Sequence, residues 1–157
     1  MSGTPISQRT DRRSASRAMG APPLGRLPGV LDLLQTARHG LAEAMVAPRP
    51  AERYAQAHVA ALRTAAAVLA ARTRPAGTRG PRSAWALLAQ VAPELGEWAT
   101  FFAAGAGKRA AAEAGLDAVT TREADDLLRD AETFLALVET TLGVPHQTSL
   151  PLGRRAG

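Results

Sequence analysis

The stretch Glu52–Arg72, ERYAQAHVAALRTAAAVLAAR, decides the fold class of this chain. Alanine and other strong helix formers fill most of its positions, and it contains neither proline nor glycine. Its apolar side chains recur every three or four residues, which places them on one face of a helix. That face consists of Tyr54, His58, Ala61, Leu62, Ala65, Val68 and Leu69. The stretch therefore predicts one long amphipathic helix, starting at Ala51 and ending near Arg72.

The composition favours helix along the rest of the chain as well. Apolar residues make up 46% of the 157 positions; 35 of these 72 residues are alanine, whereas nine are valine or isoleucine. The large side chains are few, namely two tryptophans, three phenylalanines, one tyrosine and nineteen leucines. Helices must therefore approach closely across alanine faces to form a core. The chain has no cysteine, which excludes disulfides and thiolate metal sites.

A second helix is predicted upstream. Residues 29–46 carry apolar side chains at the same three- and four-residue spacing. Pro48 and Pro50 end this helix and open the next one, because proline fits the first turn of a helix. The expected buried face consists of Val30, Leu33, Leu34, Ala37, Leu41, Ala44 and Met45.

Downstream of the first stretch, residues 73–82, TRPAGTRGPR, predict a loop because prolines and glycines interrupt helices. Ser83 is a suitable N-cap for a third helix with Trp85, Leu88 and Ala92 on one side. Pro93 either kinks this helix or starts a new one. Residues 108–114 are expected to add one or two further helical turns.

The last helix has the clearest boundaries in the sequence. Thr120 and Glu123 form a capping-box pattern, which satisfies backbone amides of the first turn in both directions. Gly143 and Pro145 are expected to end the helix. Its predicted buried face consists of Leu127, Leu128, Ala131, Leu135, Val138 and Leu142.

Four long helical segments, one of them broken, and short connections predict an all-α fold. We expect an antiparallel four-helix bundle over residues 28–145, with up to five helices if the break at Pro93 separates two of them. Residues 1–27 and 146–157 have the composition of disordered tails.

The positive charge of the chain lies mainly in these tails. The net charge is +5 and the pI is about 11.1. Residues 1–27 contribute +4 and residues 146–157 contribute +2, so residues 28–145 sum to −1. A nearly neutral bundle argues against a nucleic-acid footprint on the bundle itself. The arginine-rich tails still allow nonspecific binding to nucleic acid, which is one alternative function.

A second basic feature is the loop that follows the helix predicted at 51–72. Arg72, Arg74, Arg79 and Arg82 crowd this loop and form a candidate binding site for an anionic ligand. The alternative is an ordinary solvated loop, whose arginines face water.

Metal and membrane functions are not predicted. The three histidines, His39, His58 and His146, lie in different segments, so we expect no metal site and no cofactor. No segment is long and apolar enough to cross a membrane. The first twenty residues lack the apolar core of a secretory signal, so a cytoplasmic location is expected.

Arg53 and His58 are the candidate catalytic residues, because they form the only Arg-x4-His pairing in the chain. A histidine that takes a proton and an arginine that stabilises negative charge are sufficient to cleave RNA without a metal. Residues five apart on an ideal helix point about 140° away from each other. The two side chains therefore converge only if Arg53 lies partly outside the regular helix. The alternative is a structural His58, packed in the apolar stripe with Tyr54 and Leu62.

Three segments carry a family resemblance. They are ERYAQAHVAALRTAAAVLAAR at 52–72, SAWALLAQVAPELGEWATFFAAGAGKRAAAEAG at 83–115 and TTREADDLLRDAETFLALVE at 120–139. Together they resemble an actinobacterial branch of the HEPN domains, over residues 29–142. The resemblance implies a small antiparallel helical bundle that commonly dimerises.

The same resemblance implies two classes of function. Many HEPN domains are metal-independent endoribonucleases, often toxins partnered by a nucleotidyltransferase-like antitoxin, whereas others are inactive and bind RNA, nucleotides or proteins. In active members an Arg-x4-6-His motif near the start of the last helix lines a dimer cleft. The last predicted helix here offers Arg122 and Arg129, but no histidine follows either at that spacing. The resemblance therefore favours a non-catalytic member.

The leading hypothesis is a non-catalytic HEPN-like bundle that binds a protein, RNA or nucleotide partner. A second copy of the chain and a nucleotidyltransferase-like antitoxin are the expected protein partners. The first alternative is a metal-independent endoribonuclease that uses Arg53 and His58. The second is nonspecific binding to nucleic acid through the arginine-rich tails.

Overall fold

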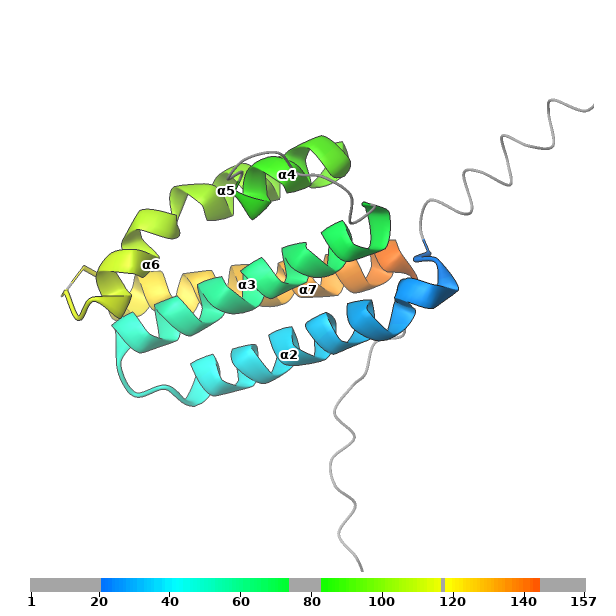
Figure 1. Cartoon of the computed structure of the whole chain (residues 1–157). Helices are drawn as coiled ribbons and strands as arrows, with labels where there is room; N and C mark the ends of the chain where they lie inside the picture. The colour runs from blue at the N-terminus through cyan, green and yellow to red at the C-terminus, as the bar shows by residue number, and fades with distance from the viewer. Residues whose placement is uncertain (1–20, 74–82, 117, 145–157) are drawn as a thin grey trace, which may run out of the picture.

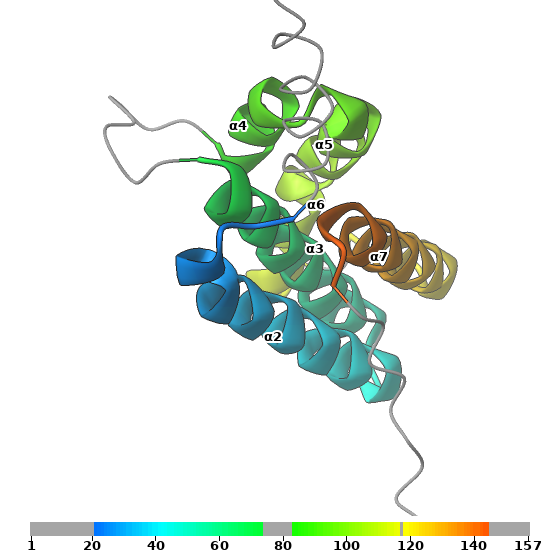
Figure 2. The same cartoon turned by 90° about the vertical axis from the view of Figure 1, so that its right-hand side faces the viewer.

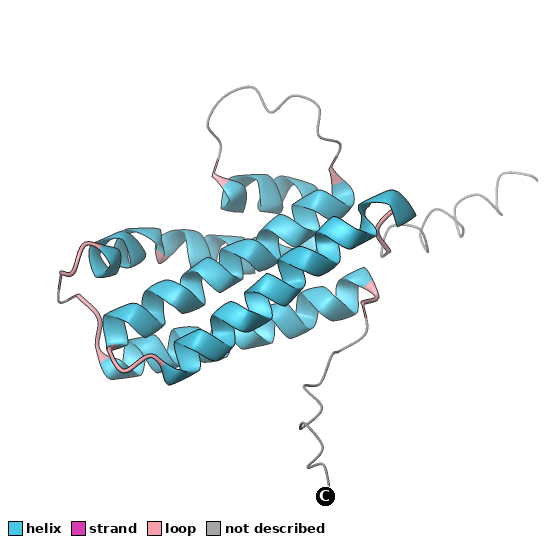
Figure 3. Cartoon of the chain, turned by 60° about the horizontal axis from the view of Figure 1, so that its bottom comes forward, coloured by secondary structure: helices cyan, strands magenta, loops and turns pink. Residues whose placement is uncertain are grey.

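The computed structural model describes residues 21–73, 83–116 and 118–144, which form helices and loops without any strand (Figure 3). The elements are η1 (Leu24–Arg26), α2 (Leu27–Val46), α3 (Pro50–Arg72), α4 (Ala84–Val91), η2 (Pro93–Leu95), α5 (Gly96–Ala104), α6 (Ala106–Glu113) and α7 (Thr121–Leu142).

Helix α3 runs antiparallel to α2 and to the series from α4 to α6, whereas α7 packs against α3 and runs in the same direction as α3 (Figure 1). Three helices, α2, α3 and α7, are long and continuous. Between α3 and α7 the chain forms a series of shorter elements, α4, η2, α5 and α6, which we call the broken helix series. The all-α bundle predicted from the sequence is therefore confirmed. No described helix is long and apolar enough to cross a bilayer.

The helix boundaries follow the local signals in the sequence. Pro28 lies in the first turn of α2, where its missing N–H leaves no hydrogen bond unmade, so α2 begins at Leu27 instead of near Gly29. A short 3-10 turn, η1, precedes it. The predicted tails are 1–27 and 146–157. Residues 1–20 and 146–157 lie outside the described residues, whereas Leu24–Arg26 form η1 and Leu27 begins α2.

Capping hydrogen bonds fix the starts of two helices as predicted. Ser83 Oγ accepts a hydrogen bond from the N–H of Ala86 at 3.1 Å, before α4. At α7, Thr120 Oγ1 accepts from the N–H of Glu123 at 3.1 Å, while Glu123 Oε2 accepts from the N–H of Thr120 at 2.8 Å. At the other end of α7, Gly143 adopts the left-handed conformation that ends the helix, with φ of 67°.

Small residues allow α2 and α3 to pack closely. A Cβ added at Gly40 of α2 would lie 3.3 Å from the Cβ of Ala60 in α3, which is tighter than ordinary van der Waals contact. The alanines of α3 are buried on several sides because α2, α4, α6 and α7 all pack around this helix. Close approach across alanine faces is thus how this chain builds a core from few large side chains.

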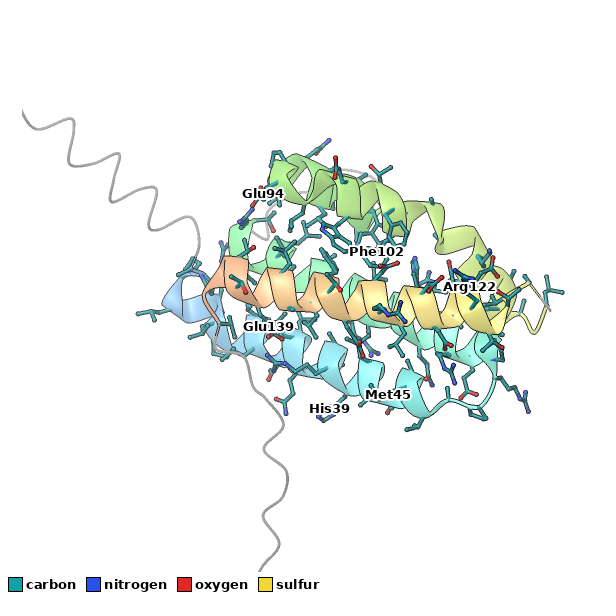
Figure 4. All side chains as sticks on the ribbon, turned by 180° about the vertical axis from the view of Figure 1, so that it is seen from behind. His39, Met45, Glu94, Phe102, Arg122 and Glu139 are labelled. Atoms are coloured by element: carbon teal, nitrogen blue, oxygen red, sulfur yellow. The ribbon has the colours of Figure 1, made fainter. Side chains whose placement is uncertain are left out.

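One residue of the predicted buried stripe of α2 is exposed. Met45 has 59% of its surface exposed, while the neighbouring Ala44 is fully buried. The two positions differ by about 100° around the helix, and the alanine takes the contact with the bundle. Met45 therefore points away from α7 near the end of α2 (Figure 4).

Aromatic rings fill the space between the broken helix series and the rest of the bundle. Figure 2 shows α4 and α5 on the opposite side of α3 from α2. Phe102 of α5 is the centre of this cluster, with ring centroids 5.1 Å from Trp85 and 5.2 Å from Phe134 of α7. The stacked rings of Trp98 and Phe134, 5.6 Å apart, extend the cluster toward the surface.

Candidate functional site

His58, the candidate general base, lies in the centre of α3 and has no exposed surface. Its Nε2 lies 2.8 Å from the carbonyl oxygen of Phe102. Because a carbonyl oxygen only accepts, Nε2 carries the proton and donates it to this bond. Burial lowers the pKa of His58, and the bond to the Phe102 carbonyl offsets this only in part. The geometry therefore holds His58 as a neutral imidazole.

Aromatic rings and a close backbone contact surround the imidazole. Tyr54 stacks on it with centroids 6.4 Å apart, and Trp85 and Phe102 meet it edge-on at 6.0 and 6.1 Å. Gly105, between α5 and α6, covers the same region. A Cβ added there would lie 2.8 Å from Tyr54 Oη and 3.3 Å from His58 Cδ2. The junction of α5 and α6 thus closes over the histidine.

Arg53, the proposed partner of His58, is directed toward other elements. It lies in the first turn of α3, and its N–H bonds to the carbonyl of Arg49 at 3.0 Å as in a regular helix. Its guanidinium pairs with Asp125 of α7 and donates to the carbonyl of Ala47 at 2.9 Å. Arg53 therefore ties the start of α3 to α7 and to the α2–α3 connection, while His58 bonds to α5.

The basic loop predicted from the sequence falls mostly outside the described residues. Arg74, Arg79 and Arg82 lie in 74–82 and stay a sequence prediction. Arg72 is described, and it forms an ion pair with Glu94 of η2 that leaves its side chain 19% exposed. This arginine joins the end of α3 to the broken helix series.

The acidic residues at the start of α7 form ion pairs both within the helix and with α3. Arg122 and Asp126 approach to 3.8 Å, as helical spacing predicts. Arg129 pairs with Asp126 at 3.9 Å instead of with Asp125. Asp125 pairs with Arg53, because the fold brings α3 beside α7. The described residues contain no group of three or more His, Asp or Glu side chains placed to hold a metal ion.

A groove with a volume of about 570 Å³ lies at one end of the bundle. We call it the loop-end groove, because its lining residues come from the α2–α3 connection, the start of α3 and the segment after α6. The α2–α3 connection and the end of α6 lie at the same end of the bundle (Figure 1). It is lined by Arg49, Pro50, Ala51, Glu52, Ala55, Gln56, Ala112, Glu113, Gly115, Leu116 and Val119.

The loop-end groove continues along α3 into a second hollow of about 290 Å³. The two hollows share Ala55, Gln56 and Glu113. At this shared point, the Oε1 atom of Gln56 is buried and accepts no hydrogen bond from the described residues. Since a buried acceptor without a donor is costly, this oxygen favours a ligand that brings an N–H or O–H group.

Large apolar side chains are exposed around the loop-end groove. Leu116 is 60% exposed in the groove wall. Met45 and Val46 do not line the groove, but they end α2 just before the connection that does, and they are 59% and 78% exposed. Sequence patterns do not single out this surface, because its residues come from connections that are distant in the sequence. An apolar residue within a loop, such as Leu116, is the only local signal.

An ion pair between Lys108 of α6 and Glu123 of α7, which we call the α6–α7 clamp, lies near Tyr54. Lys108 Nζ donates to Glu123 Oε1 at 2.6 Å, and this bond, with the N–H of Thr120, lowers the pKa of Glu123 to about 2. Burial raises the pKa of Tyr54, while the Lys108 charge lowers it in part. The clamp therefore holds the end of the broken helix series against the start of α7.

Comparison with protein families decides the classification. The family model of SAV_6107-like HEPN matches residues 44–139, which is more than half of the chain. The chain belongs to this HEPN family. The matched region contains α3, α4, α5 and α6 and most of α7, and so includes His58 and the loop-end groove. Among curated proteins and solved structures, none matches the chain.

This HEPN protein departs from the arrangement that the resemblance associates with RNA cleavage. The helix that begins after Thr120 carries Arg122 and Arg129, and no histidine lies between 121 and 142. The Arg-x4-His pairing lies instead on α3, where the two side chains have separate partners.

Proposed function

We propose that this HEPN protein is non-catalytic and binds a protein partner at the loop-end groove. One observation carries the first half of the proposal: His58 is fully buried, and its Nε2–H bonds to the carbonyl of Phe102.

A general base must come within hydrogen-bond reach of the proton that it removes, at about 2.6–3.2 Å. His58 has no exposed surface, and its protonated nitrogen already has a partner. The charge of Arg53 is likewise paired with Asp125. An RNA strand on the surface of the described bundle would therefore meet neither an accessible imidazole at His58 nor an unpaired guanidinium at Arg53. A structural role accounts for both residues.

The choice of a protein partner follows from charge and exposure. The described residues carry ten Lys and Arg side chains and twelve Asp and Glu side chains, so they give little general attraction for a phosphate backbone. Exposed apolar side chains beside a groove are typical of a protein interface. The buried Gln56 oxygen adds a polar contact that a backbone or side-chain donor of the partner would satisfy.

The resemblance supplies the two partner candidates. A second copy of the chain would give a homodimer, and a nucleotidyltransferase-like antitoxin would give a heteromeric complex. RNA and nucleotides are the competing ligands, and a cytoplasmic location is part of the same proposal. Light scattering on the purified protein distinguishes a homodimer from a monomer directly.

The test compares two exposed leucines at opposite ends of the bundle. Leu116 lines the loop-end groove and is 60% exposed, whereas Leu24 lies in η1 and is 87% exposed. Partner capture should persist in the Leu24→Arg variant and be lost in Leu116→Arg. Self-association is measured on the same variants by light scattering. Binding that survives Leu116→Arg would contradict the proposed surface, and capture of RNA in place of protein would contradict the partner class.

A further inference from the structure

A second surface feature lies between α5 and α7, away from the loop-end groove. It is a shallow pocket of about 340 Å³ lined by Glu97, Trp98, Phe101 and Asp130, and we call it the α5–α7 pocket. It shares no lining residue with the loop-end groove. Both helices are visible from behind in Figure 4, with Phe102 between them.

Two aromatic rings form the apolar wall of this pocket. Trp98 and Phe101 are three residues apart on α5, and their rings meet edge to face with centroids 6.4 Å apart. Trp98 is held in place from below, because it stacks on Phe102 at 6.0 Å and on Phe134 at 5.6 Å. Phe101 is 46% exposed. The pocket therefore presents aromatic surface in a fixed arrangement before any ligand binds.

Two carboxylates complete the pocket, one from each helix. Glu97 lies one turn before Phe101 on α5, and Asp130 approaches from α7. Neither forms an ion pair with a described residue. Arg129, next to Asp130 in the chain, is directed to Asp126 at 3.9 Å.

The surroundings of Asp130 favour a cationic ligand. Burial raises the pKa of Asp130, the nearby Asp126 carboxylate raises it further, and Arg129 lowers it only in part. A partly desolvated carboxylate beside aromatic faces is stabilised by a cation that supplies both charge and hydrogen bonds.

We propose that the α5–α7 pocket binds the guanidinium group of an arginine side chain on a protein partner. A guanidinium is planar and weakly hydrated, so it stacks on aromatic rings while its N–H groups bond to carboxylates. A lysine ammonium is more strongly hydrated and lacks the flat face. Leu137, two turns beyond Asp130 on α7 and 39% exposed, offers apolar contact to the residues that flank the arginine.

The test uses the full chain and a short synthetic peptide, acetyl-Ala-Arg-Ala-amide. Its matched control carries citrulline, which has the shape of arginine without the charge. The chain has two tryptophans, so the two indole N–H signals in an NMR spectrum report separately on the pocket residue Trp98 and on the buried Trp85. The arginine peptide should shift the Trp98 signal and leave that of Trp85 in place.

Two neighbouring aspartates of α7 provide the matched variants. Asp130→Asn should weaken binding of the arginine peptide by about threefold to tenfold, and Phe101→Ala should weaken it by about twofold to fivefold, as expected for exposed charge and cation–π contacts. Asp126→Asn should change it by less than about twofold, because Asp126 does not line the pocket. Circular dichroism at 222 nm checks that each variant keeps its helices.

Three results would overturn the proposal. If the citrulline peptide binds as tightly as the arginine peptide, the positive charge is not what the pocket recognises. If Asp126→Asn weakens binding as much as Asp130→Asn, the peptide is held by the general negative charge of α7 and not by the pocket. The third concerns an arginine of the chain itself. If replacing Arg9, Arg12, Arg13 and Arg17 by glutamine in the full chain shifts the Trp98 signal without peptide, the occupant belongs to this chain and not to a partner. None of these outcomes bears on the loop-end groove, so the two proposals fail separately.

Discussion

Gly105 is the position where one added methyl group tests the packing around His58. A Cβ at this residue would lie 2.8 Å from Tyr54 Oη, 3.3 Å from His58 Cδ2 and 3.4 Å from His58 Nε2. The first distance is too short for any side chain, and the buried tyrosine and histidine have little room to move. We therefore expect Gly105→Ala to push the α5–α6 junction away from α3.

The size of the effect follows from two opposing terms. Overpacking a well-filled core typically destabilises by about 1–3 kcal/mol. Gly105 lies between two helices but has right-handed helical backbone angles, so alanine there gains about 0.5–1 kcal/mol, which offsets part of that loss. The net prediction is a loss of about 1–2 kcal/mol in the free energy of unfolding, or about 5 °C in Tm for a domain of this size.

Gly107 provides the matched control two residues away. It lies in the first turn of α6, and a Cβ added there meets nothing within 4 Å. Gly107→Ala should therefore stabilise the protein by about 0.5–1 kcal/mol. Urea unfolding followed by circular dichroism at 222 nm measures both variants. Equal stability of Gly105→Ala and Gly107→Ala would refute the close contact.

A double substitution identifies the clashing group. Tyr54→Phe removes the hydroxyl that the new methyl group would meet at 2.8 Å. The destabilisation caused by Gly105→Ala should then fall by about 1 kcal/mol, because residues in contact are not additive. An unchanged penalty in the Tyr54→Phe background would show that a different contact is responsible.

Three further predictions concern charged and titrating groups. Arg38 pairs with the buried Glu139 at 2.7 Å, so Arg38→Ala should lower the free energy of unfolding in urea by about 3 kcal/mol, and a loss below about 1 kcal/mol would contradict a buried pair. Lys108→Met should raise the pKa of Glu123 from about 2 toward its ordinary 4.5, measured by NMR titration; an unchanged pKa would assign the shift to the helix cap alone. Burial lowers the pKa of His58 below 6.5, so the unfolded state binds the proton first and stability should fall, by at most about 1.4 kcal/mol per pH unit, as pH drops below 6.5. Urea unfolding at pH 7.5 and 5.5 should show a smaller drop in His58→Gln, and an equal drop would assign the acid sensitivity to other groups.

Much of the fold was predictable because its signals are local. The capping box at Thr120 and Glu123, the N-cap at Ser83 and the break at Pro93 each depend on residues within one helical turn. Such signals act through backbone hydrogen bonds that form between near neighbours in the sequence. The alanine-rich composition of α3 likewise predicts a helix that neighbours can approach closely.

The candidate site was less predictable because it depends on contacts between distant segments. The spacing of Arg53 and His58 is visible in the sequence, but their partners are not. Asp125 is 72 residues from Arg53, and Phe102 is 44 residues from His58. Once the helices pack, Arg53 turns to α7 and His58 to α5. Helical periodicity places a residue on a face without naming what covers that face.

The spacing of apolar residues also fails to predict which of them are exposed. Met45 fits the apolar stripe of α2 by spacing, yet Ala44 takes the contact with the bundle and leaves it in solvent. Trp98 and Phe101 have the spacing of a helix face, which predicts burial as readily as a binding pocket. The fold distinguishes a binding pocket from a buried face here, because it places Asp130 of α7 beside these two rings.

An RNA-cleavage assay in EDTA tests the central claim most directly. The full chain is incubated with single-stranded RNA beside His58→Gln, which keeps a donor for the Phe102 carbonyl, and Arg53→Lys, which keeps a charge for Asp125. Circular dichroism confirms that both variants keep their helices. We expect no cleavage above background by any of the three proteins. Cleavage by the unsubstituted chain that disappears in a folded His58→Gln variant would contradict it and assign the protein as a ribonuclease.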